Sequence, residues 1–273
     1  MISVLVLTKN EEKMIKTCLE SARQLADEIV VLDNFSSDRT VEIARKYTDK
    51  IFQKDFEGYD KERNFLAQKA NEKWLLYIDA DERVTVQLKG EILEAINNKR
   101  KVISAFAIPR KNILLGKWQK NGGWWPDNQI RLFRKDKLKS WQGELHERPV
   151  FEGELGQLKT PLIHLTHRDI VSMMEKTAQW SETEAKLRLK ASHPQISGWR
   201  LLRVMLTEFW YRAIKKQGLK EGTEGWIEAI FQSFSIFITY VRLWEVQRKQ
   251  SLEKTYQEID KRLAEDKFND LNN

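Results

Sequence analysis

Two aspartates separated by one alanine, Asp79-Ala80-Asp81, follow the apolar run WLLYI at residues 74–78. Two carboxylates this close in a turn can point to the same side, where they repel each other unless a cation lies between them. Mg²⁺ and Mn²⁺ prefer oxygen ligands and take one or two carboxylates together with substrate phosphates. The spacing is therefore typical of a metal–diphosphate site. The alternative is a solvated acidic turn in which Asp81 caps the next helix.

Acidic side chains also follow two other strand-like runs. Glu11 and Glu12 come after ISVLVLT at 2–8, and Asp33 ends EIVVLD at 28–33. In an open α/β sheet, ligands bind beyond the carboxyl ends of the strands. Acidic groups at three such ends favour a binding site over a single acidic turn, although Asp33 could instead cap the next helix.

The elements that must position these groups alternate along the first half of the chain. Short apolar runs are separated by segments of helical length and pattern, which predicts a mostly parallel sheet with helices on both faces. After residue 95 the pattern changes to strands with loops rich in Gly, Trp and Pro, and from residue 168 it is helical. The expected strands cover 2–8, 28–33, 50–53 and 73–79, and the expected helices cover 11–25, 37–47, 59–70 and 86–97.

Composition narrows the class of protein. The chain has 273 residues, of which 41% are hydrophobic and 32% charged, as in a soluble protein with a real core. A single cysteine, Cys18, excludes an internal disulfide and a zinc site of several cysteines. Met1 leads directly into an apolar run without a signal peptide, so we expect a cytoplasmic protein. The net charge of +7 favours anionic partners: nucleic acid, phosphorylated ligands or an acidic lipid surface.

Several segments resemble one known family. Those that resemble family 2 glycosyltransferases of the GT-A fold are VLVLTKNEE at 4–12, VVLDNFSSDRT at 30–40, YDKERN at 59–64 and YIDADER at 77–83. Those that resemble the lipopolysaccharide inner-core β-glucosyltransferase branch are GGWWPDNQIRLFRK at 122–135, GELHE at 143–147 and HLTHRDIVSMMEKTAQWS at 164–181. The order and spacing of these segments are more specific than any one of them.

This resemblance implies a fold and a division of the chain. The fold would be a GT-A, Rossmann-like, mostly parallel sheet between helices, with a C-terminal helical extension. The catalytic domain would cover 1–165, with a nucleotide-sugar half at about 1–100 and an acceptor half at about 101–165, and the helical region would cover 166–273.

The resemblance also implies a donor pocket and a cation, Mg²⁺ or Mn²⁺. Asp33 would contact the base or ribose of a nucleotide-sugar, for which uridine is the usual nucleoside in the family. Asp81 would bind the metal, and Asp79 would approach the ribose or the metal's waters. His164 could complete the metal shell or serve as a structural residue. The other implied donor-binding residues are Thr8, Asn10, Glu11, Arg63 and Asn64.

Glycosyl transfer also needs a base. A carboxylate that takes the proton of the attacking hydroxyl allows a single displacement, which inverts the anomeric centre. Glu147 in GELHERP is the first candidate and Asp127 in WWPDNQ the second. Glu147 could instead form a surface ion pair with Arg148.

Aromatic side chains suit the acceptor sugar, because their flat faces stack on sugar rings. Trp124 and Trp125 lie in a Gly-rich loop just before the second candidate base. An adjacent pair usually has one ring in the core, so we expect only one of the two to contact the acceptor. His146, next to the first candidate base, would lie beside it or face the metal.

The helical region has its own pattern. Basic and aromatic side chains alternate between residues 199 and 220, which is typical of a helix that lies in the plane of a membrane. The uncharged run at 229–241 is too short to cross a bilayer. The alternative is a helical pair that packs on the catalytic domain.

These inferences predict an inverting, metal-dependent hexosyltransferase. It would move glucose or another hexose from a UDP-sugar to a lipid-linked glycan such as a lipopolysaccharide core, at the inner face of the cytoplasmic membrane and without nucleic acid. One alternative is a nucleotidyltransferase of sugar phosphates, although TKNEEKM lacks the Gly-rich loop that such an enzyme carries. The other is a non-catalytic basic protein that binds membranes or nucleic acid. The sequence leaves the sugar, the acceptor and the oligomeric state open.

Overall fold

A computed structural model describes residues 1–98, 103–143 and 147–264. The chain forms two compact units, Met1–Ile170 and Val171–Asn273. The boundary that the family resemblance implies lies after residue 165.

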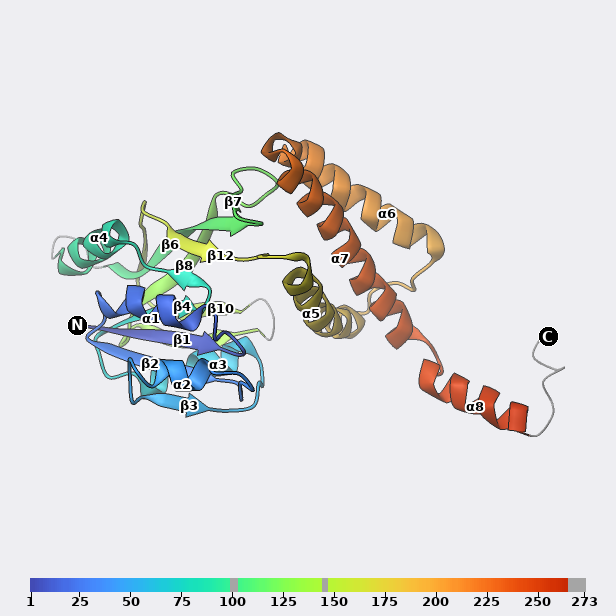
Figure 1. The fold of residues 1–273 in the computed structure, drawn as a ribbon, viewed down its shortest axis with the longest axis horizontal. Coiled ribbons are helices and arrows are strands. Elements are labelled where there is room, and N and C mark those ends of the chain that lie inside the picture. Colours follow the sequence, from blue (N-terminus) through green and yellow to red (C-terminus); the bar gives the residue numbers. More distant parts are fainter. Residues whose placement is uncertain (99–102, 144–146, 265–273) are drawn as a thin grey trace. The chain divides into compact units, whose positions relative to one another are not determined.

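The first unit is built on a ten-stranded sheet in the order β3-β2-β1-β4-β8-β6-β12-β5, with β7 and β11 paired to β6 (Figure 1). Its strands are β1 (Ile2–Thr8), β2 (Glu28–Asp33), β3 (Ile51–Gln53), β4 (Trp74–Asp79), β5 (Glu82–Arg83), β6 (Ile103–Leu114), β7 (Lys117–Trp118), β8 (Asp127–Arg134), β11 (Glu154–Gln157) and β12 (Leu162–Leu165). A separate pair is formed by β9 (Leu138–Gln142) and β10 (Arg148–Phe151).

Alternation along the buried strands gives the sheet two apolar faces. Val4 and Val6 pack in one core with residues of α1 (Ile15–Arg23), α2 (Thr40–Ala44) and α4 (Val86–Asn97). Leu5 and Leu7 pack in a second core with residues of α3 (Tyr59–Lys69) and with Trp141 of β9. The predicted α/β class, with helices on both faces of the sheet and a helical C-terminal extension, is confirmed.

The sheet is parallel only in part. The order β3-β2-β1-β4 is parallel, but β8 runs antiparallel to both β4 and β6. The expected mostly parallel sheet is therefore a mixed one, because β6 and β8 are joined as neighbouring antiparallel strands and not through a crossover helix. As a result, the start of β8 lies at the same edge of the sheet as the ends of β1, β2, β4 and β6.

The second unit is helical. It contains α5 (Ile170–Lys190), α6 (Gly198–Phe209), a π-helical turn (Trp210–Lys215), a 3₁₀ turn (Gly218–Glu221), α7 (Thr223–Gln247) and α8 (Leu252–Ala264). The first turn of α7 packs tightly, since a Cβ added at Gly225 would lie 2.0 Å from the carbonyl oxygen of Gly218. The ring of Phe209 in α6 lies 6.2 Å from that of Trp226 in α7. Among the described residues, no helix is long and apolar enough to span a bilayer.

Candidate active site

Asp79 is the last residue of β4, and each of its carboxylate oxygens accepts a hydrogen bond from an arginine. Its Oδ1 lies 3.3 Å from Nη2 of Arg63 on α3, and its Oδ2 lies 2.6 Å from Nη2 of Arg131 on β8. Both arginines are buried. Removal from solvent raises the pKa of Asp79, but the charges of Arg131 and Arg63 outweigh this effect and hold the pKa well below its ordinary value. Asp79 is therefore a stable anion that holds two guanidinium groups at this edge of the sheet.

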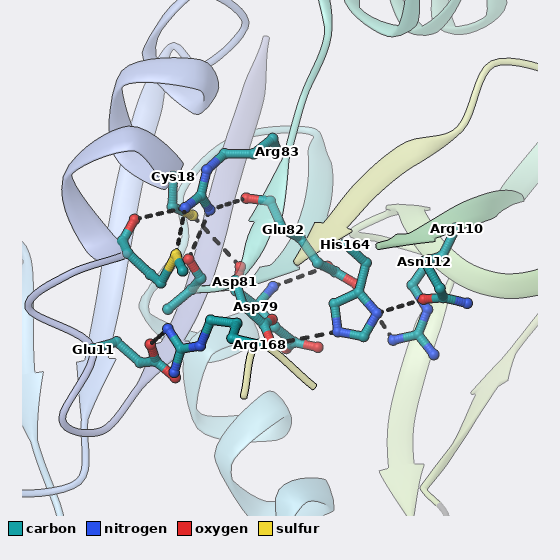
Figure 2. Close-up of polar contacts among 12 residues, drawn as sticks. Glu11, Cys18, Asp79, Asp81, Glu82, Arg83, Arg110, Asn112, His164 and Arg168 are labelled. Atoms are coloured by element: carbon teal, nitrogen blue, oxygen red, sulfur yellow. Dashed lines mark hydrogen bonds and ion pairs between the residues drawn. The ribbon is translucent and has the colours of Figure 1, made fainter. Parts of the chain in front are cut away.

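A further carboxylate, that of Glu82, fixes the same turn and was not predicted. It is fully buried, and its Oε2 accepts a hydrogen bond of 3.0 Å from the backbone N–H of Asp79. Its Oε1 lies 3.3 Å from Nη2 of Arg131 and 3.4 Å from Nη1 of Arg110. Figure 2 labels Glu82 and Arg110 on either side of His164. Burial lowers the pKa of Arg131, but Asp79 and Glu82 outweigh it and raise that pKa above its ordinary value. Buried charges of both signs thus compensate one another around the turn.

His164 comes to Asp81 through strand pairing. It lies on β12, opposite Glu82 of the antiparallel β5 and opposite Asn112 of the parallel β6. Its Nε2 lies 3.4 Å from Oδ2 of Asp81, and its Nδ1 lies 2.6 Å from Oδ1 of Asn112. The backbone N–H of Leu165 donates to the carbonyl of Asp81, which fixes the turn beside the strand. Two predicted metal ligands are thus brought together.

Asp81 and His164 fit a divalent cation that would take most of its ligands from water and substrate phosphates. Asp81 and His164 offer one carboxylate oxygen and one imidazole nitrogen on facing sides of a 3.4 Å gap. In the described part of the chain, no group of three or more His, Cys, Asp or Glu side chains could hold a metal ion. A site of this kind suits Mg²⁺ or Mn²⁺, which keep waters and bind substrate phosphates beside one or two protein ligands.

The ends of β1 and β2 form a second group of predicted residues. Thr8 pairs with Asp33 in the parallel register, and Asp33 is fully buried. The Asp33 carboxylate accepts from the backbone N–H and hydroxyl of Ser36 and from the Gln53 amide. Asn10, at a positive φ of 52°, donates its N–H to the Ser36 hydroxyl. The two loops are thereby locked together beside a buried Thr8 hydroxyl that has no hydrogen-bond partner.

Arg63 joins the turn to the first candidate base. Its Nε donates to Oε1 of Glu147 over 2.9 Å, while its Nη1 is buried without a hydrogen-bond partner. The guanidinium lies over the ring of Trp141, 5.1 Å from its centroid. The neighbouring Asn64 exchanges two hydrogen bonds with the backbone of Trp141. Arg63 therefore faces the site, whereas the Asn64 amide anchors β9.

Asp127, the second candidate base, is surrounded by donors. Arg110 approaches its Oδ2 with Nε and Nη2, each at 2.8 Å, Asn112 donates to the same oxygen over 3.0 Å, and Gln129 donates to Oδ1 over 2.7 Å. Burial raises the pKa of Asp127, but the charge of Arg110 and the hydrogen bonds from Asn112 and Gln129 lower it more, and the net pKa lies below its ordinary value. Its hydrogen-bonding capacity is largely used within the protein.

The predicted acceptor residues lie in the loop before β8. Trp124 packs edge-to-face on His167, with ring centroids 5.3 Å apart, and Trp125 packs edge-to-face on Trp118 at 5.7 Å. Both indoles are partly exposed, so neither is a full core residue. His146 lies outside the described residues.

The structure thus gathers most predicted residues at one edge of the sheet. Glu11 belongs to this edge through an ion pair of 3.1 Å with Arg168 (Figure 2). The polar residues that sequence reasoning missed are Glu82, Arg110, Asn112, Arg131 and Arg168.

Comparison with known proteins points to one family. The model described as "Glycosyl transferase family 2" matches residues 3–150. The chain is 29% identical over 261 residues to an uncharacterized glycosyltransferase of Rickettsia typhi, covering 91% of this chain and 88% of that one. It is 25% identical over 259 residues to the lipopolysaccharide core biosynthesis glycosyltransferase LpsC of Rhizobium meliloti, covering 89% and 92%. Among solved structures it aligns with S. aureus TarS in complex with UDP-GlcNAc, at a TM-score of 0.45 and 16% identity over 94% of this chain and 91% of that one, which is too distant to identify a ligand.

Proposed function

Because the chain belongs to glycosyl transferase family 2, we propose that it transfers a hexose from a UDP-sugar to a lipid-linked glycan, with a divalent cation and with inversion. Family membership sets aside the nucleotidyltransferase and the non-catalytic alternatives. The observation that carries the proposal is the approach of His164 to Asp81 beside the buried Arg63 and Arg131. An imidazole, a carboxylate and guanidinium groups at the carboxyl ends of parallel strands suit a sugar diphosphate.

The nucleoside would bind at the ends of β1 and β2. A ligand hydroxyl or carbonyl there would satisfy the buried Thr8 hydroxyl, which otherwise costs free energy because it lacks a hydrogen bond. Asp33 would act by locking the loops after β1 and β2 in place, because it is fully buried and already accepts hydrogen bonds from the Ser36 N–H, the Ser36 hydroxyl and the Gln53 amide. The choice of uridine follows from the family resemblance.

The diphosphate would bind at the turn after β4. Asp81 and His164 would hold the divalent cation, which when bound neutralises the charge that grows on the leaving diphosphate. Arg63 would donate from Nη1, which is buried and lacks a partner. Asp79 would act by fixing Arg63 and Arg131, since both of its oxygens already accept from them.

Glu147 would be the base. It takes the proton of the acceptor hydroxyl as that oxygen bonds to the anomeric carbon, and the bond from this carbon to the diphosphate breaks with release of the nucleoside diphosphate. Arg63 orients its carboxylate through one hydrogen bond and leaves other lone pairs for the hydroxyl. Asp127 is the weaker candidate because it already accepts from three side chains.

The acceptor would be a lipid-linked glycan. The partly exposed rings of Trp124 and Trp125 support stacking on a sugar. The name of the LpsC relative supports a lipopolysaccharide-type acceptor. A lipid-linked acceptor would also require the enzyme to work at the surface of the cytoplasmic membrane.

The apolar surface of α6 and of the π-helical turn that follows it supports such membrane contact. Trp199, Leu202, Leu206 and Trp210 recur at intervals of three or four residues and are each about half exposed or more. Exposed basic residues accompany this face: Arg203, Lys215, Lys216 and Lys220. Apolar and basic side chains on one exposed helical segment suit the headgroup region of an anionic bilayer.

A donor screen tests the proposal. The full-length protein with Mn²⁺ is incubated with UDP-glucose, other UDP-hexoses and a GDP-hexose, and nucleotide release by slow hydrolysis is measured. We expect release from one or more UDP-hexoses only, together with heat stabilisation by UDP plus Mn²⁺. No release from any donor and no stabilisation by UDP would refute the donor class.

A further inference from the structure

Asn112 occupies a buried position between the cation-binding residues and the acceptor loop. It is fully buried on β6, and its Nδ2 donates to Oδ2 of Asp127 over 3.0 Å and to the carbonyl oxygen of Trp124 over 3.0 Å. Its Oδ1 lies 2.6 Å from Nδ1 of His164. One amide therefore contacts the acceptor loop, a candidate base and the imidazole that faces Asp81.

The surroundings of Asn112 fix the orientation of its amide. A carboxylate and a backbone carbonyl only accept hydrogen bonds from it, so the NH₂ group must face them. The low pKa of Asp127 keeps that carboxylate ionised. The amide oxygen must then face His164, where it can only accept. The proton of a neutral His164 ring must therefore lie on Nδ1.

This tautomer has a consequence at Nε2. A ring protonated at Nδ1 carries a bare lone pair at Nε2, which faces Oδ2 of Asp81 over 3.4 Å. Two lone-pair atoms repel each other at this separation unless a cation lies between them. In the opposite tautomer, Nε2–H would simply donate to Asp81, and the pair would need no metal. The position of this one proton thus decides whether His164 and Asp81 can act as a pair of metal ligands or are joined by an ordinary hydrogen bond.

We propose that Asn112 is a positioning residue that holds His164 as the Nδ1–H tautomer and so presents Nε2, together with Asp81, to the cation. The role of the cation rests on the proposed function, but the tautomer does not. Because the same amide holds the carbonyl of Trp124, the cation-binding pair and the acceptor loop depend on one side chain. Partners of metal-binding histidines commonly fix the tautomer in this way.

The first test is a ¹⁵N–¹H NMR spectrum of the metal-free, ¹⁵N-histidine-labelled protein at about pH 9, well above the ordinary pKa of imidazole. The chain has only four histidines, and His164→Gln identifies the signal. We expect the Nδ1–H tautomer in the wild type and its loss in Asn112→Leu. A wild-type ring protonated at Nε2 would overturn the proposal, and this measurement needs no variant of Asn112 to fold.

The second test is Mn²⁺ affinity, measured by EPR with UDP present. Asn112→Leu should weaken Mn²⁺ binding by about 10–100-fold. The matched control is Gln129→Leu, which removes another donor to Asp127 but has no contact with His164, and it should leave the tautomer unchanged and the affinity within about twofold. Equal losses in both variants would contradict a role through His164. If no donor is hydrolysed but the tautomer is Nδ1–H, the proposed function fails while the tautomer assignment stands.

Discussion

Nε2 of His164 lies 3.4 Å from Oδ2 of Asp81, although Asp81 lies near the middle of the first unit's sequence and His164 near its end. Pairing of β12 with β5 and β6 brings them together, and buried arginines surround the turn beside them. The proposed role of a cation in sugar transfer depends on that proximity.

Replacement of Asp81 should remove the effect of the cation on the donor. In Asp81→Asn, heat stabilisation by UDP plus Mn²⁺ should fall to that of UDP alone, and activity should fall by about 100-fold or more, because one of the two protein ligands is weakened. The control is Asp136→Asn, an exposed carboxylate paired with Arg134, which should behave as the wild type. Full Mn²⁺-dependent stabilisation of Asp81→Asn would contradict the assignment.

Replacement of Glu147 should affect turnover more than donor binding. In Glu147→Gln, kcat should fall by about 10²–10⁴-fold with a nearly unchanged KM for the donor, because the base is lost and the hydrogen bond from Arg63 can still form. Glu152→Gln, at an exposed carboxylate paired with Lys139, is the matched control. If Asp127→Asn lowers kcat without changing the KM for the donor and Glu147→Gln does not, Asp127 and not Glu147 is the base.

Because of Glu62, the free energy of unfolding should decrease as pH rises. Burial raises its pKa to about 7 from 4.5, more than the hydrogen bond from Asn34 and the charge of Arg63 lower it. The folded protein therefore holds a proton that the unfolded chain releases between pH 4.5 and about 7, so the stabilisation present below this window is lost as pH rises through it. Glu62→Gln should flatten this decline by at most about 3 kcal/mol in chemical denaturation.

The control for this prediction is Glu42→Gln. Glu42 is exposed, and its hydrogen bond from Arg39 lowers its pKa, so its loss cannot remove a decline with rising pH. Parallel stability–pH curves for the wild type and Glu62→Gln would show that Glu62 titrates normally in the folded protein.

Charge reversal at three exposed basic residues of the segment 199–220 should release the protein from anionic vesicles. Each Lys or Arg near such a surface contributes about 1 kcal/mol, so a variant with Arg203, Lys215 and Lys216 changed to Glu should bind on the order of 100-fold more weakly in sedimentation with phosphatidylglycerol vesicles. The matched control reverses three exposed charges of α8, at Lys254, Lys261 and Arg262. Equal loss in both variants would indicate a general charge effect, and unchanged sedimentation of the first would refute membrane contact by α6.

The sequence predicts the parallel half of the sheet well. The bounds of β2 and α4 match the expectation because apolar runs and helical periodicity determine them. Helix α1 starts at Ile15 and not near Glu11, since the N–H groups of Glu11 and Glu12 donate to the side chains of Thr40, at the start of α2, and of Asp38 in the loop before it. That contact between distant segments leaves no local signal.

The polar network around the turn was only partly predictable. Asp79 and Asp81 are visible as a motif, but Arg131 reads as one polar residue in a strand, and only its position beside Asp79 in the mixed sheet reveals its role. Asn112 is likewise an isolated amide until β12 pairs with β6. Alternation in RLFR could have indicated that Arg131 shares a buried face with Phe133.

The most direct measurement is the anomalous diffraction of Mn²⁺ in crystals soaked with MnCl₂ and UDP. We expect one manganese peak within bonding distance of Asp81 Oδ2, His164 Nε2 and the UDP phosphates. Bound UDP with its manganese far from Asp81, or with His164 Nε2 donating a hydrogen bond directly to Asp81, would contradict the proposed cation site.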